Sequence, residues 1–417
     1  MAKRARRPGT AKAKGNTASP RRKPKGELTF AHLKARALAA SLLPPTTLAR
    51  AMTGLGFVQA DPIRSPARAQ DLILRHRVAG YRVGDLERSF RELKLDEDFL
   101  YAYGFMPREI ARLLHPRLDP RGRPHRPTGL AADVLAFVRE RGTTHPQELA
   151  ASFGKERAVN NWGGFSKATT RALHSLHFHG LLRVAHRRDG IRLYEPAPAR
   201  EEDMSAQERR RRLLLLVLRL LAPLPKKSLN PTLALLARGA PRLRQGMPKA
   251  LDALLRSGAV ESAVIESETW LWPSDMPVPE KGEPPRELRF LAPFDPIVWD
   301  RRRFEHLWGW EYRFEAYTPI AKRRRGYYAM PLLYGDEMIG WVNLANPDER
   351  LQVEAGFIGS PPQDKDFRRA FDAEIARFER FLLPRNNALS APVRKEAAVR
   401  RPPVVRSGHP GQRERAT

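Results

Sequence analysis

The chain has 417 residues and a formal net charge of +29, with 75 lysines and arginines against 46 aspartates and glutamates. Such a charge favours a polyanionic partner: nucleic acid, whose counterions are released when clustered cations bind, or alternatively an anionic membrane surface. The chain has no cysteine, which excludes disulfides, thiolate nucleophiles and cysteine-ligated zinc or iron–sulfur centres.

Both ends of the chain have the composition of disordered tails, rich in charge, proline, glycine and alanine. Residues 1–26 contain ten lysines and arginines and no acid, and residues 386–417 contain seven against two. The tails thus supply +15 of the net charge, and residues 27–385 retain +14. We therefore expect a folded body that is itself basic, between two disordered basic tails.

Residues 27–127 are predicted to form a first winged-helix-like domain, because apolar residues recur at helical spacing in three segments. A short extended segment separates the second helix from the third. The three predicted helices span residues 30–42, 46–55 and 65–79.

The extended segment contains Gln59-Ala60-Asp61, followed at once by Pro62. Alternate side chains of an extended chain point to one face, so Gln59 and Asp61 are expected to project together. A carboxylate beside an amide can activate a water or stabilise developing positive charge, which makes the two residues our catalytic candidates. The alternative is structural: Asp61 caps a helix that begins at Pro62.

Residues 128–200 show the clearest unit, three helices followed by a hairpin, which predicts a second winged helix. An Asp-Gly pair at 189–190 joins the two predicted strands and is a strong hairpin signal. The helices are expected at residues 130–141, after a cap at 144–148, and at 166–178, and the strands at 181–186 and 191–195.

Three basic side chains of this unit, Lys167, Arg171 and His174, follow helical spacing on its third helix. That helix faces the DNA groove in helix-turn-helix proteins, so we expect DNA contacts, with a merely solvated basic face as the alternative.

Two further basic clusters are candidate DNA contacts. The alternatives are an exposed turn for the first and a charged loop for the second. The first cluster lies at the predicted hairpin tip and comprises His186, Arg187 and Arg188. The second precedes Gly326-Tyr327-Tyr328 and comprises Lys322, Arg323, Arg324 and Arg325.

The rest of the chain predicts a third winged helix at 204–274, a linker at 275–286 and a β-barrel-like domain with a C-terminal helix at 287–385. In the third winged helix we expect helices near 206–221, 230–238 and 247–257 and a hairpin of 259–265 with 268–272. In the last domain, segments 311–329 and 330–345 are predicted to be rich in β-structure, and 365–383 to be helical. The fold class is thus mainly α with α+β units: tandem winged helices, a small C-terminal β-barrel and a terminal helix.

No metal or cofactor is expected. His174, His177 and His179 stand close together, but no carboxylate lies at a supporting spacing, and no glycine-rich phosphate loop is present.

Phe57-Val58-Gln59-Ala60-Asp61-Pro62-Ile63 and the distant LAPFDPIVWDRR of residues 291–302 are similar to two stretches of the bacterial crosslink-repair DNA glycosylases of the YcaQ/AlkZ type. The first resembles the catalytic motif of that family, which is glutamine, an apolar residue, then glutamine or aspartate. This chain has the aspartate form. Residues 317–319 and 322–328 add a further likeness, and the resemblance covers about residues 28–385.

The resemblance implies tandem winged helices curved around duplex DNA. It implies a monofunctional glycosylase that hydrolyses the N-glycosidic bond of bulky N7-alkylated purines, including interstrand crosslinks. Asp61 would activate the water and Gln59 would orient it. We expect a monomer that acts on duplex DNA without a membrane, in the cytoplasm and associated with the nucleoid. The alternative function is that of a non-enzymatic winged-helix DNA binder or transcription regulator.

One segment departs from the family pattern. Family members often carry Trp-x-His-x-Ala-Ser after the first domain, where this chain has Tyr103-Gly104-Phe105-Met106-Pro107. If the missing histidine shapes the lesion pocket, the substrate range of this chain differs.

Overall fold

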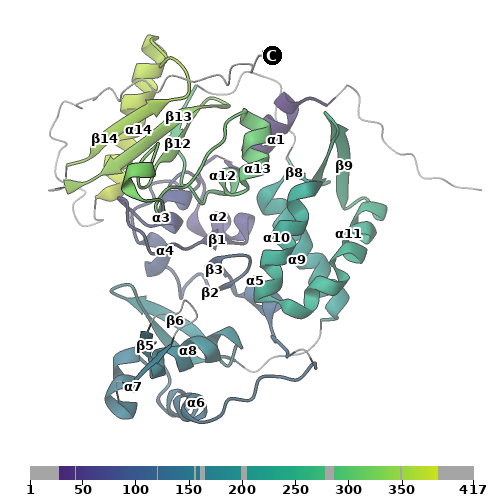
Figure 1. Ribbon diagram of the computed structural model, residues 1–417, viewed down its shortest axis with the longest axis vertical. Helices are drawn as coiled ribbons and strands as arrows, with labels where there is room; N and C mark the ends of the chain where they lie inside the picture. The colour runs from purple at the N-terminus through teal and green to yellow at the C-terminus, as the bar shows by residue number, and fades with distance from the viewer. Residues whose placement is uncertain are drawn as a thin grey trace, which may run out of the picture.

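A computed structural model of the chain shows four groups of elements. The second unit lies at one end of the molecule, the C-terminal sheet lies at the other, and the first unit lies between them (Figure 1). The predicted tails and most of the predicted linker fall outside the described residues. The structure describes residues 28–42, 44–119, 121–154, 156–159, 165–198, 204–277, 286–347 and 350–383.

The first unit is built around a three-stranded antiparallel sheet with the strand order β1-β3-β2. The predicted extended segment forms β1 (Val58–Gln59), which pairs with β3 (Tyr103–Pro107). The hairpin of β3 with β2 (Leu95–Phe99) was not predicted. The helices around this sheet are α2 (Leu48–Leu55), α3 (Ala69–Leu74), α4 (Asp85–Arg88) and α5 (Arg108–Leu114).

The third predicted helix, residues 65–79, is wrong in its extent, because α3 covers six residues only. The chain after α3 docks on the C-terminal unit instead of continuing the helix. The guanidinium of Arg77 donates two hydrogen bonds, of 2.8 and 2.9 Å, to the carboxylate of Asp295. His76 Nε2 donates a hydrogen bond of 2.9 Å to the carbonyl of Phe290. The helix therefore ends just before residues that bind the chain more than 200 positions later in the sequence.

The first predicted helix is present as α1 (Phe30–Ser41), but it does not complete the first unit. Its buried face, Leu33 and Ala37, belongs to the same core as Ile297 and Phe304 of the C-terminal unit. The helix therefore packs on the C-terminal unit and not, as predicted, within a domain spanning residues 27–127.

The second unit has the predicted elements. Its helices are α6 (Leu130–Arg141), α7 (Pro146–Phe153) and α8 (Ala168–Phe178), and its hairpin is β6 (Leu182–Arg188) with β7 (Ile191–Pro196). Asp189 and Gly190 both have positive φ, 50° and 77°, as a tight two-residue hairpin turn requires. A short pair, β4 (Arg157–Val159) and β5 (Phe165–Lys167), precedes α8. This unit has a core of its own, centred on the contacts of Val138, Leu176 and Val184.

The third unit also follows the prediction, except that its second helix starts four residues earlier than expected. Its hairpin gains a third strand in the sheet order β8-β10-β9. The elements are α9 (Ala206–Leu221), β8 (Leu224–Pro225), α10 (Lys226–Gly239), η1 (Pro241–Gly246), α11 (Met247–Arg256), β9 (Val260–Ile265) and β10 (Glu268–Pro273).

The described residues of the C-terminal unit form an open antiparallel sheet in the order β11-β12-β13-β14, in place of the β-barrel-like domain that the sequence predicted. The edge strand β11 is covered by a helix rather than by β14: Glu374 of α14 accepts a hydrogen bond of 3.0 Å from the backbone N–H of Phe290. The predicted terminal helix is this α14. The elements are β11 (Leu288–Phe290), α12 (Pro296–Trp299), α13 (Arg301–Trp308), η2 (Ile320–Lys322), β12 (Met330–Tyr334), β13 (Glu337–Ala345), β14 (Gln352–Phe357) and α14 (Lys365–Leu382).

Residues 311–329, expected to be rich in β-structure, form a loop that contains only the short η2. The carboxylate of Glu315 accepts hydrogen bonds from the backbone N–H groups of Arg324 and Arg325, at 2.9 and 2.8 Å. These donors are therefore not available to a strand partner.

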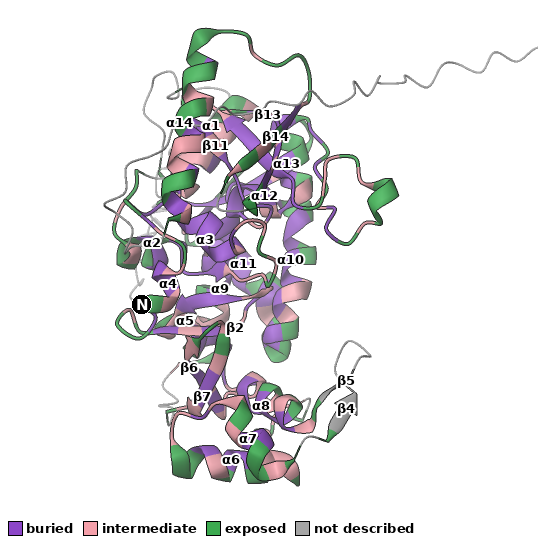
Figure 2. Cartoon of the chain, turned by 90° about the vertical axis from the view of Figure 1, so that its left-hand side faces the viewer, coloured by how far each residue is buried: buried purple, intermediate pink, exposed green. Residues whose placement is uncertain are grey.

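One apolar core runs through the first, third and C-terminal units, whereas the second unit packs its own. The hairpin β6–β7 lies between the helices of the second unit and strand β2 of the first (Figure 2). No helix among the described residues is both long and apolar enough to cross a bilayer.

Candidate active site

Gln59 is held from a distant part of the chain. It ends strand β1 and is partly buried, and its Oε1 accepts a hydrogen bond of 2.9 Å from Nε1 of Trp299. Trp299 ends α12 and packs on Tyr101, with 4.4 Å between the ring centroids. Because the indole N–H can only donate, it fixes Oε1 on its own side and directs the amide NH₂ of Gln59 the other way.

Asp61 follows β1 directly. Its Oδ1 accepts a hydrogen bond of 2.9 Å from the backbone N–H of Ile63, a local turn that fixes the carboxylate. Burial raises the pKa of Asp61 above its ordinary value, and the hydrogen bond from Ile63 offsets part of this effect. The alternative that Asp61 caps a helix starting at Pro62 is wrong, because the next helix starts at Ala69.

The conspicuous acids of the 291–302 stretch have structural roles. Asp295 caps α12 by accepting a hydrogen bond of 3.0 Å from the N–H of Ile297, and it also binds Arg77. Asp300 caps α13 by accepting one of 2.7 Å from the N–H of Arg303. Within this stretch, Trp299 is the residue that binds Gln59.

The loop 311–329 contributes tyrosines on which the charge of Asp61 acts. Tyr317 is 81% exposed, whereas Tyr328 is buried. Burial raises the pKa of Tyr317 and of Tyr328, and the charge of Asp61 is the next cause in both.

The predicted DNA-contact residues Lys167, at the N-cap of α8, and Arg171 and His174, within α8, are all exposed. The surrounding protein and, next, the charge of Arg192 lower the pKa of His174 to about 4, so His174 is neutral at pH 7. The guanidinium of Arg192 lies 4.3 Å from the ring centre of Tyr103, on the strand next to β1. Arg192 of β7 thus lies between this face of α8 and strand β3, which pairs with β1.

The three DNA contacts predicted at the hairpin tip differ in whether the side chain is free to bind DNA. Arg187 donates two hydrogen bonds of 2.6 Å to the fully buried carboxylate of Glu97, so its charge is neutralised within the protein. His186 contacts Arg91 at 2.9 Å. Arg188 is exposed. The prediction of a phosphate contact is thus not supported at Arg187, and it remains a prediction at the other two.

The basic cluster at 322–325 also contains both half-buried and exposed side chains. Arg323 donates a hydrogen bond of 2.8 Å to the carbonyl of Thr318, and Arg325 donates one of 2.7 Å to the carbonyl of Glu311. Both side chains are half-buried and support the loop, whereas Lys322 and Arg324 are exposed.

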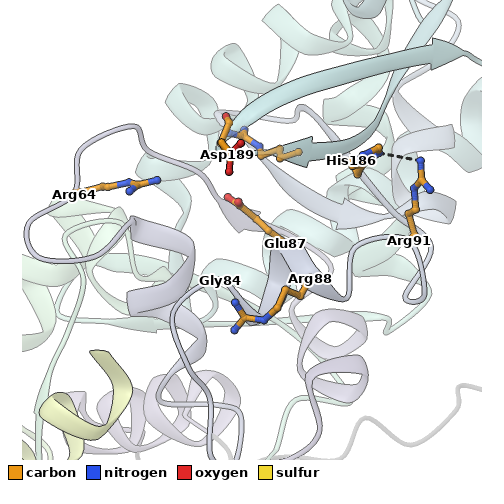
Figure 3. A pocket seen from close by; sticks show the side chains of 9 residues that line it. Arg64, Gly84, Glu87, Arg88, Arg91, His186 and Asp189 are labelled. Carbon is orange, nitrogen blue, oxygen red and sulfur yellow. Dashed lines mark hydrogen bonds between the residues drawn. The ribbon is translucent and has the colours of Figure 1, made fainter. Parts of the chain in front are cut away.

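An open pocket of about 750 Å³ lies between the loop after Asp61 and the hairpin tip. Figure 3 shows Arg64 and Glu87 on the side of the pocket opposite Asp189, with His186 hydrogen-bonded to Arg91. The charges of Arg88 and Glu87 are paired with Asp85 and Arg68. Arg64 and Arg91 also line this pocket. They could not be selected as candidate DNA contacts from the sequence, because charge alone does not distinguish them in so basic a chain.

The histidine run at 174–179 does not converge on one point. His177 Nε2 donates a hydrogen bond of 2.9 Å to the carbonyl of Glu97, and His179 stacks on His125 with 3.8 Å between ring centroids. Within the described stretches, no three histidine, aspartate or glutamate side chains are grouped as a metal site.

Residues 52–381 match the family described as DNA glycosylase AlkZ-like, and the chain belongs to this family. It is therefore a DNA glycosylase of DNA repair, as the sequence resemblance indicated. The fold is also similar to that of the solved Streptomyces sahachiroi DNA glycosylase AlkZ. The TM-score is 0.58 at 15% sequence identity, and the match covers 85% of this chain and 97% of that chain.

Proposed function

We propose that this enzyme is a monofunctional DNA glycosylase that hydrolyses the N-glycosidic bond of bulky N7-alkylated purines in duplex DNA, including interstrand crosslinks. The observation that carries the proposal is the paired geometry of Asp61 and Gln59. One carboxylate oxygen of Asp61 is held by Ile63, and the amide of Gln59 is oriented by Trp299.

The chemistry requires little more than this pair. A purine alkylated at N7 is already cationic, so it leaves without a general acid. The oxygen of a water bonds to C1′ of the sugar, and the bond from C1′ to N9 breaks with its electrons moving to the purine. Asp61 takes the proton of the water and stabilises the oxocarbenium-like sugar, and Gln59 orients the water.

The exposure of the site supports the proposed substrate class. A base tethered to the opposite strand cannot be extruded completely, so a crosslink suits a site that does not need full base flipping. Asp61 is only partly buried. The protein is proposed to act as a cytoplasmic, nucleoid-associated monomer.

We propose that the helix-and-hairpin units at 128–200 and 204–274 act as winged helices around the duplex. The proposed phosphate contacts are seven cations that are exposed and have no carboxylate partner among the described residues, together with His174 and His186 as hydrogen-bonding groups. These cations are Lys167, Arg171, Arg188, Lys322 and Arg324 from the sequence, and Arg64 and Arg91 from the structure.

The test uses purified protein and two duplexes, one bearing N7-methylguanine and one bearing an N7–N7 crosslink. We expect free alkylated base and an alkali-labile abasic site from the first, and unhooked strands from the second. DNA binding without abasic product from either duplex would favour the non-enzymatic alternative. Release from the monoadduct alone would restrict the proposal to monoadducts.

A further inference from the structure

The open pocket of about 750 Å³ lies where the loop after Asp61 meets the tip of the hairpin β6–β7. Arg64 lies on one side of the pocket, and Arg91 and His186 lie on the other (Figure 3). Arg64 and Arg91 are exposed, and neither is paired with a carboxylate among the described residues. Two positive charges that the protein leaves accessible therefore line the pocket.

The hydrogen bond between Arg91 and His186 determines what the histidine can bind. The guanidinium of Arg91 lies 2.9 Å from Nδ1 of His186. A guanidinium can only donate, so Nδ1 accepts, and the proton of the neutral imidazole is on Nε2. His186 therefore contributes a further N–H donor to the lining of the pocket, and Arg91 keeps its remaining N–H groups for a ligand.

Most other charged side chains of the pocket are paired within the protein. The pairs are Arg88 with Asp85, Glu87 with Arg68, and Arg187 with Glu97. Asp189 also lines the pocket, but it is exposed to solvent at the hairpin tip. The accessible groups are thus chiefly cations and N–H donors, which favour an anionic ligand with several acceptor oxygens. A backbone phosphate of DNA is such a ligand.

The pocket is close to the proposed catalytic pair along the chain. Arg64 follows Asp61 by three residues, so their Cα atoms are at most about 11 Å apart. The hairpin tip lies against the same segment, because a Cβ atom on Gly190 would stand 2.5 Å from Nη2 of Arg68. One strand of duplex DNA advances about 3.4 Å per nucleotide along its axis, so a separation of about 11 Å corresponds to about three nucleotides.

We propose that this pocket binds a single backbone phosphate of the DNA, within about three nucleotides of the lesion. The guanidinium groups of Arg64 and Arg91 bind its oxygens, and Nε2–H of His186 donates to it. Arg64 and Arg91 belong to the first unit and His186 to the second, so this phosphate fixes the register of the lesion strand or its complement against both units. The inference rests on the proposed function and adds to it the place of one phosphate.

The experiment replaces one phosphate at a time by a neutral methylphosphonate, along both strands around an N7-methylguanine. Affinity and single-turnover base release are measured for the full-length wild type and for Arg64→Gln. In the wild type, the methylphosphonate that enters the pocket is expected to weaken binding about tenfold, as for a lost charge-assisted hydrogen bond. In Arg64→Gln the same replacement should weaken binding by a smaller factor, because one partner of that phosphate is already missing.

Arg368→Gln is the matched control. Arg368 is an exposed arginine of α14, it has no carboxylate partner among the described residues, and it does not line the pocket. This variant should show the full wild-type factor at the sensitive phosphate. Arg64→Lys keeps the positive charge and is expected to regain part of the factor that Arg64→Gln loses.

Equal methylphosphonate effects in wild type and Arg64→Gln at every position would overturn the inference. A phosphate that is coupled to Arg64 but lies farther than about three nucleotides from the lesion would overturn it as well. Because affinity needs no turnover, a wild type that binds the duplex and releases no base would contradict the proposed function, and the coupling of Arg64 to one phosphate would still decide the role of the pocket.

Discussion

Gln59 and Asp61 are separated by one residue in sequence but are held by different parts of the chain. Asp61 is fixed by its own turn through Ile63, whereas Gln59 is fixed by Trp299, which lies 240 residues later. The position of Asp61 is therefore local, and that of Gln59 depends on the docking of the C-terminal unit.

Trp299→Phe should lower activity by removing the donor that orients the amide of Gln59. We expect base release to slow about tenfold, the effect of one lost hydrogen bond, with little change in DNA affinity. The matched control is Trp272→Phe, since the indole of Trp272 donates to Glu261 instead, at 2.9 Å. Equal rates for the two variants in a single-turnover assay would contradict the role of Trp299.

The pH dependence of the reaction should report Asp61. Its carboxylate must be ionised to accept the proton of the water, and burial raises its pKa above 3.8. The ratio kcat/KM is therefore expected to fall as the pH drops through a midpoint above 3.8, and the midpoint is read from a rate profile. An acid limb that persists unchanged in a slow Asp61→Asn variant would assign the titration to another group.

At the scale of single residues, the sequence identifies the proposed catalytic residues but not the residues that hold them in place. Gln59 and Asp61 are identifiable because they share a short extended segment and a family motif. Trp299 was visible only as part of a characteristic stretch. Its contact with Gln59 depends on chain segments that meet in the folded state, which local spacing does not encode.

At the scale of elements, the hairpin β6–β7 is locked onto the first unit by buried charge. Glu97 of β2 binds Arg187 and is approached by Arg192 at 3.5 Å. Although burial acts to raise it, these guanidinium groups hold the pKa of Glu97 below its ordinary value. The buried carboxylate of Glu97 is thus one of the groups that fix the second unit on the first, together with Asp96, which binds Arg183 at 2.9 Å.

Glu97→Gln should destabilise the protein strongly, because Arg187 would be left buried without a counter-ion. Breaking such a pair costs about 3–5 kcal/mol. Glu208→Gln is the control, since Glu208 pairs with Arg211 and Arg212 on the exposed face of α9 and should change stability by less than about 1 kcal/mol. Similar urea midpoints for the two variants would refute the locking role of Glu97.

The acidic side chains of β2 explain why the β2–β3 hairpin was not predicted. The strand Leu95–Phe99 contains three consecutive acids, a composition that disfavours a buried strand. Asp98 is buried because it binds His115 and Arg117, at 2.5 and 2.8 Å. By contrast, the second unit was predictable because its helix caps and its Asp-Gly turn are local signals.

At the scale of the whole molecule, the protein has a large positive net charge although its candidate active site contains the carboxylate of Asp61. Residues 27–385 carry +14 and the two tails add +15. One continuous core fixes the first, third and C-terminal units together, while the second unit attaches through its hairpin. The sequence predicted the order of these units but not that α1 and residues 75–77 interlock them.

Deleting residues 1–26 and 386–417 should weaken DNA binding without slowing the chemistry. Each tail cation that contacts a phosphate contributes about 0.9 to the slope of log affinity against log salt. We expect a smaller slope and a lower affinity in salt titrations, and an unchanged single-turnover rate at saturating enzyme. An unchanged slope would show that the folded body alone accounts for the electrostatic binding.

The central claim is that Asp61 activates the water, and the most direct measurement is single-turnover release of N7-methylguanine from duplex DNA by Asp61→Asn. Asp252→Asn, at an exposed position of α11, provides the matched control. With DNA affinity retained, Asp61→Asn is expected to lose at least about 100-fold in rate while Asp252→Asn stays at the wild-type rate. Release by Asp61→Asn at the wild-type rate would contradict the account.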